Sequence, residues 1–301
     1  ARGWQAWRQG TRFYATERHE RTVYHVRRFP DAFRRFRRMK TDPLRLNQLL
    51  FRRDIKRILA AQPYDLVITG PSSYMTGFLP EHLDVPVVFD YLDCGDWENH
   101  PGVMHPEEVY LRTADTALGV SALAMRRIEE AGLPGLLLTN GADVAMMREA
   151  DGTAVRQRFE LGDAPVVSLI GLTYSRTSFY FLDAIQEARR RVPGLRCLLV
   201  GRNAALEEEV AARNDDTFVW VGPVSYAEVP AYFAASNVGL YPVDETIYFH
   251  GASPIKLFEY TAAGVPVVLP RLEEAQRMGL GSLRFVTPAA SSCAAALEAA
   301  L

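Results

Sequence analysis

The sequence is poor in the residues that mark several classes of protein. Its three cysteines, Cys94, Cys197 and Cys293, have no Cys-x-x-Cys spacing, and its six histidines lack the spacing of metal ligands. This argues against a disulfide framework and a zinc cluster. The sequence has no uncharged apolar run long enough to cross a membrane, and its Arg-rich start is unlike a signal peptide. We therefore expect a cytoplasmic protein of a reducing compartment, without a bound metal.

The small net charge of -2 conceals a strong asymmetry. Residues 1–60 contain 17 Lys and Arg against 5 Asp and Glu, so this segment carries +12 and the remainder -14. A basic segment can face anionic lipid, phosphate-bearing substrates or nucleic acid, and a solvated Arg-rich helix explains it equally well. Between Phe29 and Met39, aromatic residues alternate with arginines, which suits contact with an anionic membrane surface or, more simply, packing in the core. As a partner, the membrane surface is favoured over nucleic acid.

From Ala164 onward, short apolar runs alternate regularly with helical patterns. Continuous apolar strands separated by helices predict a parallel sheet covered on both faces, as in a doubly wound α/β domain. The predicted strands are Val166–Ile170, Leu195–Val200, Thr217–Val221, Val238–Tyr241, Val265–Leu269 and Leu283–Val286. The predicted helices are Ser178–Arg191, Ala204–Arg213, Tyr226–Ala235, Pro254–Ala263, Glu273–Met278 and Ser291–Leu301.

The first half shows the same alternation less completely, which predicts a second α/β domain. Glycines and mixed charges interrupt the pattern between Ala142 and Asp163, so we expect one domain over residues 1–150 and another over residues 151–301. The chain opens on a helical pattern rather than on a strand and a Gly-rich turn, so we expect the first domain to lack its first strand. The predicted strands are Thr22–Val26, Leu66–Thr69, Val87–Phe89, Ala117–Val120 and Leu136–Leu138, and the predicted helices are Gln5–Ala15, Leu46–Ala61 and Leu123–Ala131.

The segment Ser253–Pro270, SPIKLFEYTAAGVPVVLP, carries the clearest chemical signal. Ser253 and Pro254 are typical of a helix start, where Ser caps free N–H groups and Pro takes the first helical position, and Gly264 is suited to end the helix. The preceding His250, Gly251 and Ala252 predict a small-residue loop that lets a ligand approach the backbone. A helix start facing such a loop can bind phosphate.

Helical periodicity places Glu259 on the same face as Lys256, which by itself fits a simple exposed ion pair. The whole pattern, PxKLFEYxAAGxPVV, resembles the donor-site signature of retaining glycosyltransferases of the GT-B fold, of glycosyltransferase family 4 or group 1. The resemblance implies two Rossmann-like domains, a nucleotide-sugar donor, a Glu259 that binds the ribose, and a helix start that receives the diphosphate with Ser253 and Lys256.

Weaker matches extend along the chain. Val221–Pro242 is similar to a strand, helix and strand of that family, which implies that Trp220–Pro223, including Gly222, lies near the nucleobase. Leu137–Val144, LLTNGADV, resembles the turn between the two domains. The sequence departs from the family at Gly251, where the fuller motif has a sugar-contacting Glu. It also departs after Gly171, where the family's Arg and Lys are replaced by a single nearby cation, Arg176, which we assign to the donor phosphates.

The resemblance implies sugar transfer without a metal or other cofactor, since the sequence has no Asp-x-Asp triplet of the metal-dependent transferases. The helix N–H groups, Arg176 and Lys256 would instead stabilise the leaving diphosphate. Asp90, Asp93 and Asp96 follow a predicted strand, where α/β sheets place ligand contacts, or they serve the turn itself. Asp93 and His250 are the candidate catalytic residues, and no general base is assigned.

Three functions remain open. The leading hypothesis is a retaining glycosyltransferase whose acceptor is a polysaccharide, a lipid-linked molecule or a small molecule, with possible membrane contact through residues 1–60. A nucleotide-sugar epimerase shares the fold, but acidic residues and His would be expected around its sugar, and Gly251 offers neither. A catalytically silent module that binds nucleotides or polyanions is the third hypothesis.

Overall fold

The computed structural model describes residues 14–19, 22–27, 56–61, 63–70, 84–92, 106–171 and 179–301. Its internal contacts group the chain into two compact units. The first comprises Ala1–Asp65 and Ser72–Asp84, and the second comprises Leu66–Pro71 and Val85–Leu301. The second unit holds both parallel sheets and therefore all of the described site candidates.

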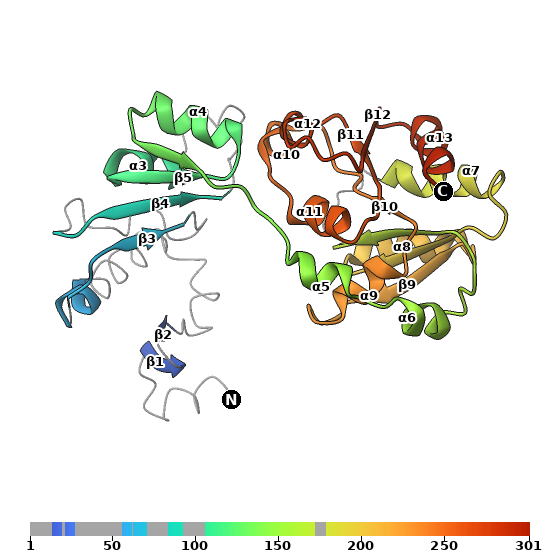
Figure 1. Ribbon diagram of the computed structural model, residues 1–301, viewed down its shortest axis with the longest axis horizontal. Helices are drawn as coiled ribbons and strands as arrows, with labels where there is room; N and C mark the ends of the chain where they lie inside the picture. The colour runs from blue at the N-terminus through green and yellow to red at the C-terminus, as the bar shows by residue number, and fades with distance from the viewer. Residues whose placement is uncertain are drawn as a thin grey trace, which may run out of the picture. The chain divides into compact units, whose positions relative to one another are not determined.

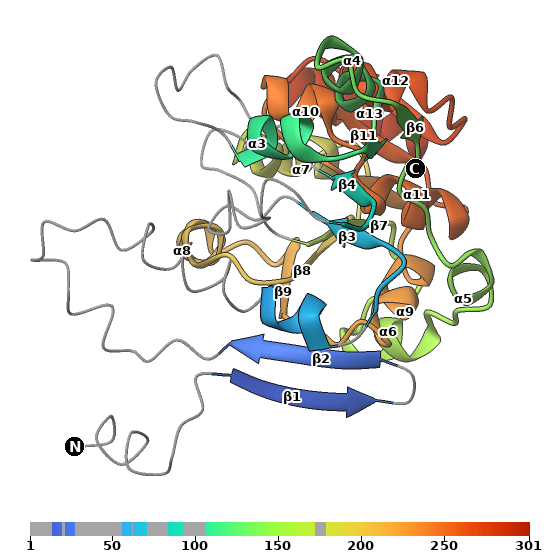
Figure 2. The same ribbon diagram turned by 90° about the vertical axis from the view of Figure 1, so that its left-hand side faces the viewer.

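The described part of the first unit is a β-hairpin and a short helical stretch at residues 56–61. Strand β1 (Tyr14–His19) pairs antiparallel with β2 (Thr22–Arg27), with His19 opposite Thr22 (Figure 2). The predicted helix over Gln5–Ala15 is therefore wrong at its last two residues. The predicted strand at Thr22–Val26 is present, but it lies in this hairpin rather than in a parallel sheet. The segment is rich in Tyr, Thr and Val, and this composition favours strands.

A four-stranded parallel sheet begins the second unit. Its order is β3-β4-β5-β6, so each strand lies beside its neighbour in the chain. In β4 the ring of Phe89 lies 5.1 Å from those of both Tyr91 and Tyr110, which forms a buried aromatic stack. The strands are β3 (Val67–Thr69), β4 (Val87–Tyr91), β5 (Thr116–Gly119) and β6 (Gly135–Leu137), and the helices are α3 (Pro106–Thr113) and α4 (Ala122–Glu130). All four strands were predicted within two residues, whereas α3 was not.

A six-stranded sheet follows, in the order β12-β11-β10-β7-β8-β9 and parallel throughout (Figure 1). Its first strand in the chain, β7, lies in the middle, with β8 and β9 on one side and β10 to β12 on the other. This is the doubly wound order, whose direction reverses between β7 and β10. The strands are β7 (Val166–Ile170), β8 (Arg196–Val200), β9 (Phe218–Gly222), β10 (Val238–Leu240), β11 (Val267–Pro270) and β12 (Leu283–Val286).

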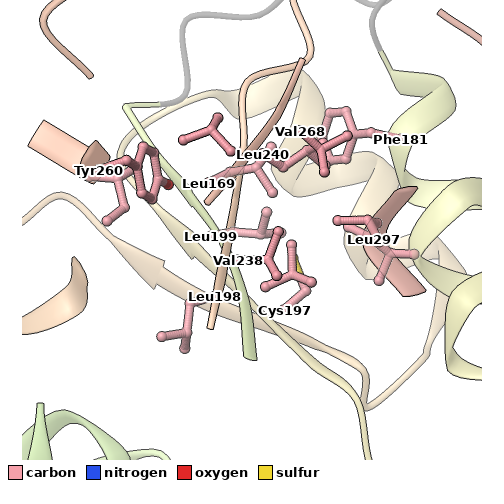
Figure 3. Packing of buried hydrophobic residues seen from close by; sticks show 14 of the residues in the cluster. Leu169, Phe181, Cys197, Leu198, Leu199, Val238, Leu240, Tyr260, Val268 and Leu297 are labelled. Atoms are coloured by element: carbon pink, nitrogen blue, oxygen red, sulfur yellow. The ribbon is translucent and has the colours of Figure 1, made fainter. Parts of the chain in front are cut away.

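Helices connect these strands and complete one hydrophobic core. Helix α13 packs against α7, and α9 packs against β7. Figure 3 shows strand residues such as Leu169 and Val268 in this cluster together with Phe181 of α7 and Leu297 of α13, all fully buried. The helices are α5 (Val144–Arg148), α6 (Thr153–Arg158), α7 (Tyr180–Arg189), α8 (Ala204–Arg213), α9 (Val229–Ala234), α10 (Ile247–Gly251), α11 (Ile255–Ala262), α12 (Glu273–Arg277) and α13 (Ala290–Ala300). The doubly wound prediction is confirmed, and only α5, α6 and α10 were not predicted.

Candidate functional site

The reversal of strand order between β7 and β10 marks where a ligand binds in this class of sheet, beyond the carboxyl ends of the strands. Gly171 follows β7 directly with a positive φ of +86°, a conformation that favours glycine. A Cβ atom at Gly171 would lie 3.4 Å from Cε of Lys256. The first turn of α11 therefore lies next to the end of β7, as a phosphate-binding helix start requires.

The start of α11 differs from the prediction. Its N-cap is Pro254, with an extended backbone and no side-chain capping bond, so the prediction that Ser253 caps the helix is wrong. Ser253 is instead buried, and its Oγ has no hydrogen-bond partner among the described residues. Helices α4, α5 and α8 each have a capping side chain that accepts a bond from a first-turn N–H group. The first turn of α11 lacks such a cap, which leaves it suited to an anion.

The predicted pairing of Glu259 with Lys256 is present, but it is no exposed surface pair. Lys256 Nζ lies 2.7 Å from Glu259 Oε2, and the Glu259 side chain is only 1% exposed against 27% for Lys256. The ammonium group also lies 5.6 Å from the ring centroid of Phe233. The second carboxylate oxygen, Oε1, is buried and has no partner within the described part of the chain. A buried carboxylate oxygen in this state is destabilising unless a ligand or a water molecule satisfies it.

Tyr226 is a site residue that the sequence reasoning missed. Desolvation and then the negative charge of the Glu259 carboxylate raise the pKa of Tyr226. The side chain is nevertheless largely exposed. The exposed phenol is therefore close enough to Glu259 for the carboxylate charge to affect its ionisation. The only sequence signal was an aromatic residue just before a helix, which is common in many proteins.

Tyr260 fixes the orientation of α11 against the sheet. Its hydroxyl donates a hydrogen bond of 2.9 Å to the carbonyl oxygen of Ser168 in β7, and its ring stands edge-on to Phe233 at 4.6 Å. In β10, a Cβ atom at Gly239 would lie 2.5 Å from the Tyr260 ring. The glycine thus lets α11 approach the sheet closely, and the adjacent Glu259 is held in place by this packing.

The segment before α11 is not the predicted loop. Residues Ile247–Gly251 form α10, which Thr246 caps by accepting a bond from Phe249 N. Gly251 is buried, and a Cβ atom there would lie 2.3 Å from Cδ2 of Leu123. A side chain at this position, including the Glu of the fuller motif, would therefore require Leu123 to shift.

A known family, a curated protein and several solved structures are similar to parts of this chain. Residues 164–301 match the family model Glycosyl transferases group 1. The putative teichuronic acid biosynthesis glycosyltransferase TuaH of Bacillus subtilis (strain 168) is 33% identical over 99 residues, which are 31% of this chain and 24% of TuaH. The chain thus spans about a quarter of this curated relative. The group 1 match includes α11, Lys256 and Glu259.

Several solved structures have a similar fold over most of the chain. Sucrose-phosphate synthase from Thermosynechococcus elongatus superposes with a TM-score of 0.69 at 19% identity, covering 87% of this chain and 70% of that one. An α,α-trehalose-phosphate synthase from Burkholderia xenovorans superposes with a TM-score of 0.72 at 13% identity, covering 96% of this chain and 81% of the synthase. HepE from Anabaena, solved in complex with UDP, superposes with a TM-score of 0.58 at 16% identity, covering 81% of this chain and 71% of HepE. The chain has the GT-B fold with two Rossmann-like domains.

The remaining predicted site residues fall in different places. In the six-stranded sheet, Gly222 ends β9 at the edge of the sheet, with a positive φ of +78°. His250 Nδ1 accepts a bond of 3.3 Å from Glu273 N, and Ala252 follows α10 in an extended conformation, half-buried. Asp90 lies in β4, where burial raises the pKa of its carboxyl group. Arg176, Asp93 and Asp96 lie outside the described residues.

In the described segments, no group of three or more His, Cys, Asp or Glu side chains is arranged to hold a metal ion. No helix in those segments is both long enough and apolar enough to cross a bilayer.

Proposed function

We propose that this protein is a retaining glycosyltransferase that binds a nucleotide sugar at the start of α11 and transfers the sugar to a polysaccharide, lipid-linked or small acceptor. The observation that carries the proposal is a pair of buried polar atoms without partners among the described residues, Ser253 Oγ and Glu259 Oε1. They flank the uncapped first turn of α11, where strand order reverses. Such atoms are rare unless a ligand or water satisfies them.

Each group has a chemical role in this proposal. The first-turn N–H groups of α11 and the ammonium group of Lys256 would hold the diphosphate, whose charge increases as the bond from the sugar to phosphate oxygen breaks. Glu259 Oε1 would accept a hydrogen bond from a ribose hydroxyl. The new bond forms from the sugar to an acceptor oxygen, whose proton passes to the leaving diphosphate or to water. Because protein groups supply the positive charge, we propose that transfer needs no metal.

The relatives support the substrate classes. One structural neighbour, HepE, is described in complex with UDP, and with UDP and glucose, which supports a nucleoside diphosphate as the leaving group. The name of TuaH refers to teichuronic acid biosynthesis, which supports a polysaccharide acceptor. The excess of 17 basic over 5 acidic residues in residues 1–60 is consistent with an anionic membrane surface close to the acceptor.

The test is to incubate the protein with a panel of nucleotide sugars, with and without EDTA, and to measure the release of nucleoside diphosphate. We expect release that survives EDTA and disappears in Glu259→Ala. Release that stops with EDTA and returns with added Mg²⁺ would contradict metal independence. An epimerised donor sugar without release of nucleoside diphosphate would instead support the epimerase hypothesis. Binding of a nucleotide sugar with neither product would support the catalytically silent module.

A further inference from the structure

Asn140 makes a contact with the start of α11 that crosses most of the sequence. Its side-chain Nδ2 donates a hydrogen bond of 2.6 Å to the backbone carbonyl oxygen of Ser253, 113 residues away. Asn140 is half-buried and belongs to the turn after β6. The bond therefore fixes the residue that directly precedes the N-cap of α11.

A second contact holds the same two segments together. Asp143, three residues after Asn140, caps α5 by accepting a bond of 3.0 Å from Met146 N. Helix α5 in turn packs against α11. The turn after β6 is therefore attached to α11 at two points, at its start through Asn140 and along its length through α5.

The bond from Asn140 is important because the start of α11 has no side-chain cap of its own. Neither Ser253 nor Pro254 caps the first turn of α11 with its side chain. The Ser253 Oγ itself is buried without a partner in the described segments. The bond from Asn140 is thus a side-chain restraint on the backbone at the start of the helix. If the backbone at Ser253 could move, the first-turn N–H groups of α11 and Ser253 Oγ would both be misaligned. Misplacement of binding groups weakens the binding of a ligand such as a diphosphate sharply.

We infer that Asn140 is a positioning residue of the donor site. It does not touch the nucleotide sugar but holds the start of α11 in the orientation that binds the diphosphate. This inference rests on the proposed function. It predicts a loss of affinity for a bare nucleoside diphosphate, so it can be tested without turnover.

The test compares Asn140→Ala and Asn140→Asp with wild type, using calorimetric titration with UDP, GDP, ADP, CDP and dTDP. We expect Asn140→Ala to weaken the binding of the preferred diphosphate about tenfold. Asn140→Asp should weaken it further at about pH 8, because a carboxylate cannot donate a bond and would face a carbonyl oxygen. Lowering the pH to about 5 should restore part of the Asn140→Asp affinity relative to Asn140→Ala, since a carboxyl group in that position has a raised pKa and donates when protonated.

Asn237→Ala is the matched control. Asn237 also makes a side-chain bond to backbone, with its Oδ1 accepting from Val166 N at 2.9 Å. It directly precedes β10, and so lies at the amino ends of the parallel strands, whereas α11 starts beyond their carboxyl ends. We expect this variant to lose stability to a similar degree, measured by urea unfolding, while keeping wild-type affinity.

The possible results separate the two claims. If wild type binds none of the five diphosphates, the proposed function fails and the role of Asn140 fails with it. If wild type binds a diphosphate and both Asn140→Ala and Asn140→Asp bind it as tightly as wild type does, only the positioning role of Asn140 is overturned. Equal losses of affinity in Asn140→Ala and Asn237→Ala would also overturn it, because they would show a general effect on the fold.

Discussion

Lys256 and Glu259 lie 2.7 Å apart, from Nζ to Oε2, yet the two ends of this ion pair have different surroundings. Lys256 reaches solvent and can be hydrated. Glu259 is buried, and its Oε1 has no partner in the described part of the chain. Because a buried charged oxygen without a hydrogen bond is costly, the pair is better explained by ligand binding than by stability.

Glu259→Gln tests this explanation while keeping the shape of the side chain. The amide has no charge, and its oxygen is a weaker acceptor for a ribose hydroxyl. We expect the affinity for the donor's nucleoside diphosphate to fall at least about tenfold, as for the loss of a hydrogen bond to a charged group. The free energy of unfolding should change by less than about 1 kcal/mol, because removing the buried charge of Glu259 offsets the loss of the ion pair. Calorimetric titration and urea unfolding measure the two effects.

Glu187→Gln is the control for that variant. Glu187 pairs with Arg191 four residues on, and both side chains are substantially exposed. We expect neither affinity nor stability to change appreciably. Unchanged affinity in Glu259→Gln would remove Glu259 from the donor site.

Gly251→Ala should destabilise the fold. A Cβ atom there would lie 2.3 Å from Cδ2 of Leu123, closer than atoms can pack, so the Leu123 side chain must shift within a packed contact. Overpacking of this kind typically costs about 1–3 kcal/mol, which urea unfolding would show. Adding Leu123→Ala should recover part of the loss, because it removes the atom that clashes.

Gly141→Ala is a suitable comparison, since a Cβ atom at Gly141 would meet nothing within 4 Å. We expect little change in its free energy of unfolding. Additive effects of Gly251→Ala and Leu123→Ala would show that the two residues are not in contact. For the same steric reason, Gly251→Glu should not create a sugar-binding site but should destabilise the protein.

Much of the six-stranded sheet could be predicted because each of its strands is a recognisable apolar run in the sequence. Val166–Ile170 and Leu283–Val286 were predicted to the residue, as was helix Ala204–Arg213. Burial on both faces makes such strands continuously apolar, so their limits are visible in the sequence. The helices α5 and α10 were not predicted because each has only five residues, too few to show a helical period.

The site was predicted in outline but not in its contacts. Local capping rules favoured Ser253 as the N-cap, but Asn140, 113 residues away, holds its carbonyl group and the N-cap falls at Pro254. Gly251 was interpreted as a missing sugar ligand, whereas its closeness to Leu123 depends on a contact between distant segments. Such tertiary contacts override local preferences and leave no trace in a short stretch of sequence.

Tyr260→Phe should separate stability from binding. The Tyr260 hydroxyl donates to the Ser168 carbonyl oxygen at 2.9 Å and is fully buried, so its removal should lower the free energy of unfolding by about 1–2 kcal/mol. The ring remains against Phe233, so α11 should keep its place and the affinity for the nucleoside diphosphate should change less than about threefold. Ser168→Ala, which keeps the backbone carbonyl, should lose less stability. A large loss of affinity in Tyr260→Phe would show that the hydroxyl itself positions α11.

Two buried thiols predict how stability depends on pH in the alkaline range. Burial raises the pKa of Cys293 to about 12 and also raises that of Cys197. In the unfolded chain, thiols ionise near pH 8.5, so above about that pH the unfolded state loses protons that the folded state keeps. The stabilisation is therefore complete below the unfolded pKa and is lost as the pH rises, by up to about 1.4 kcal/mol per pH unit for each thiol.

Cys293→Ala isolates the contribution of one thiol. We expect its free energy of unfolding, measured in urea from about pH 7 to about pH 10, to fall less steeply above pH 8.5 than that of wild type. Other titrating groups contribute equally to both proteins, so the difference in slope belongs to Cys293. Ser291→Ala, an exposed change in the same helix α13, should leave the slope unchanged. Parallel curves for wild type and Cys293→Ala would mean that the Cys293 thiol ionises as readily in the folded protein as in the unfolded chain, and is therefore open to water.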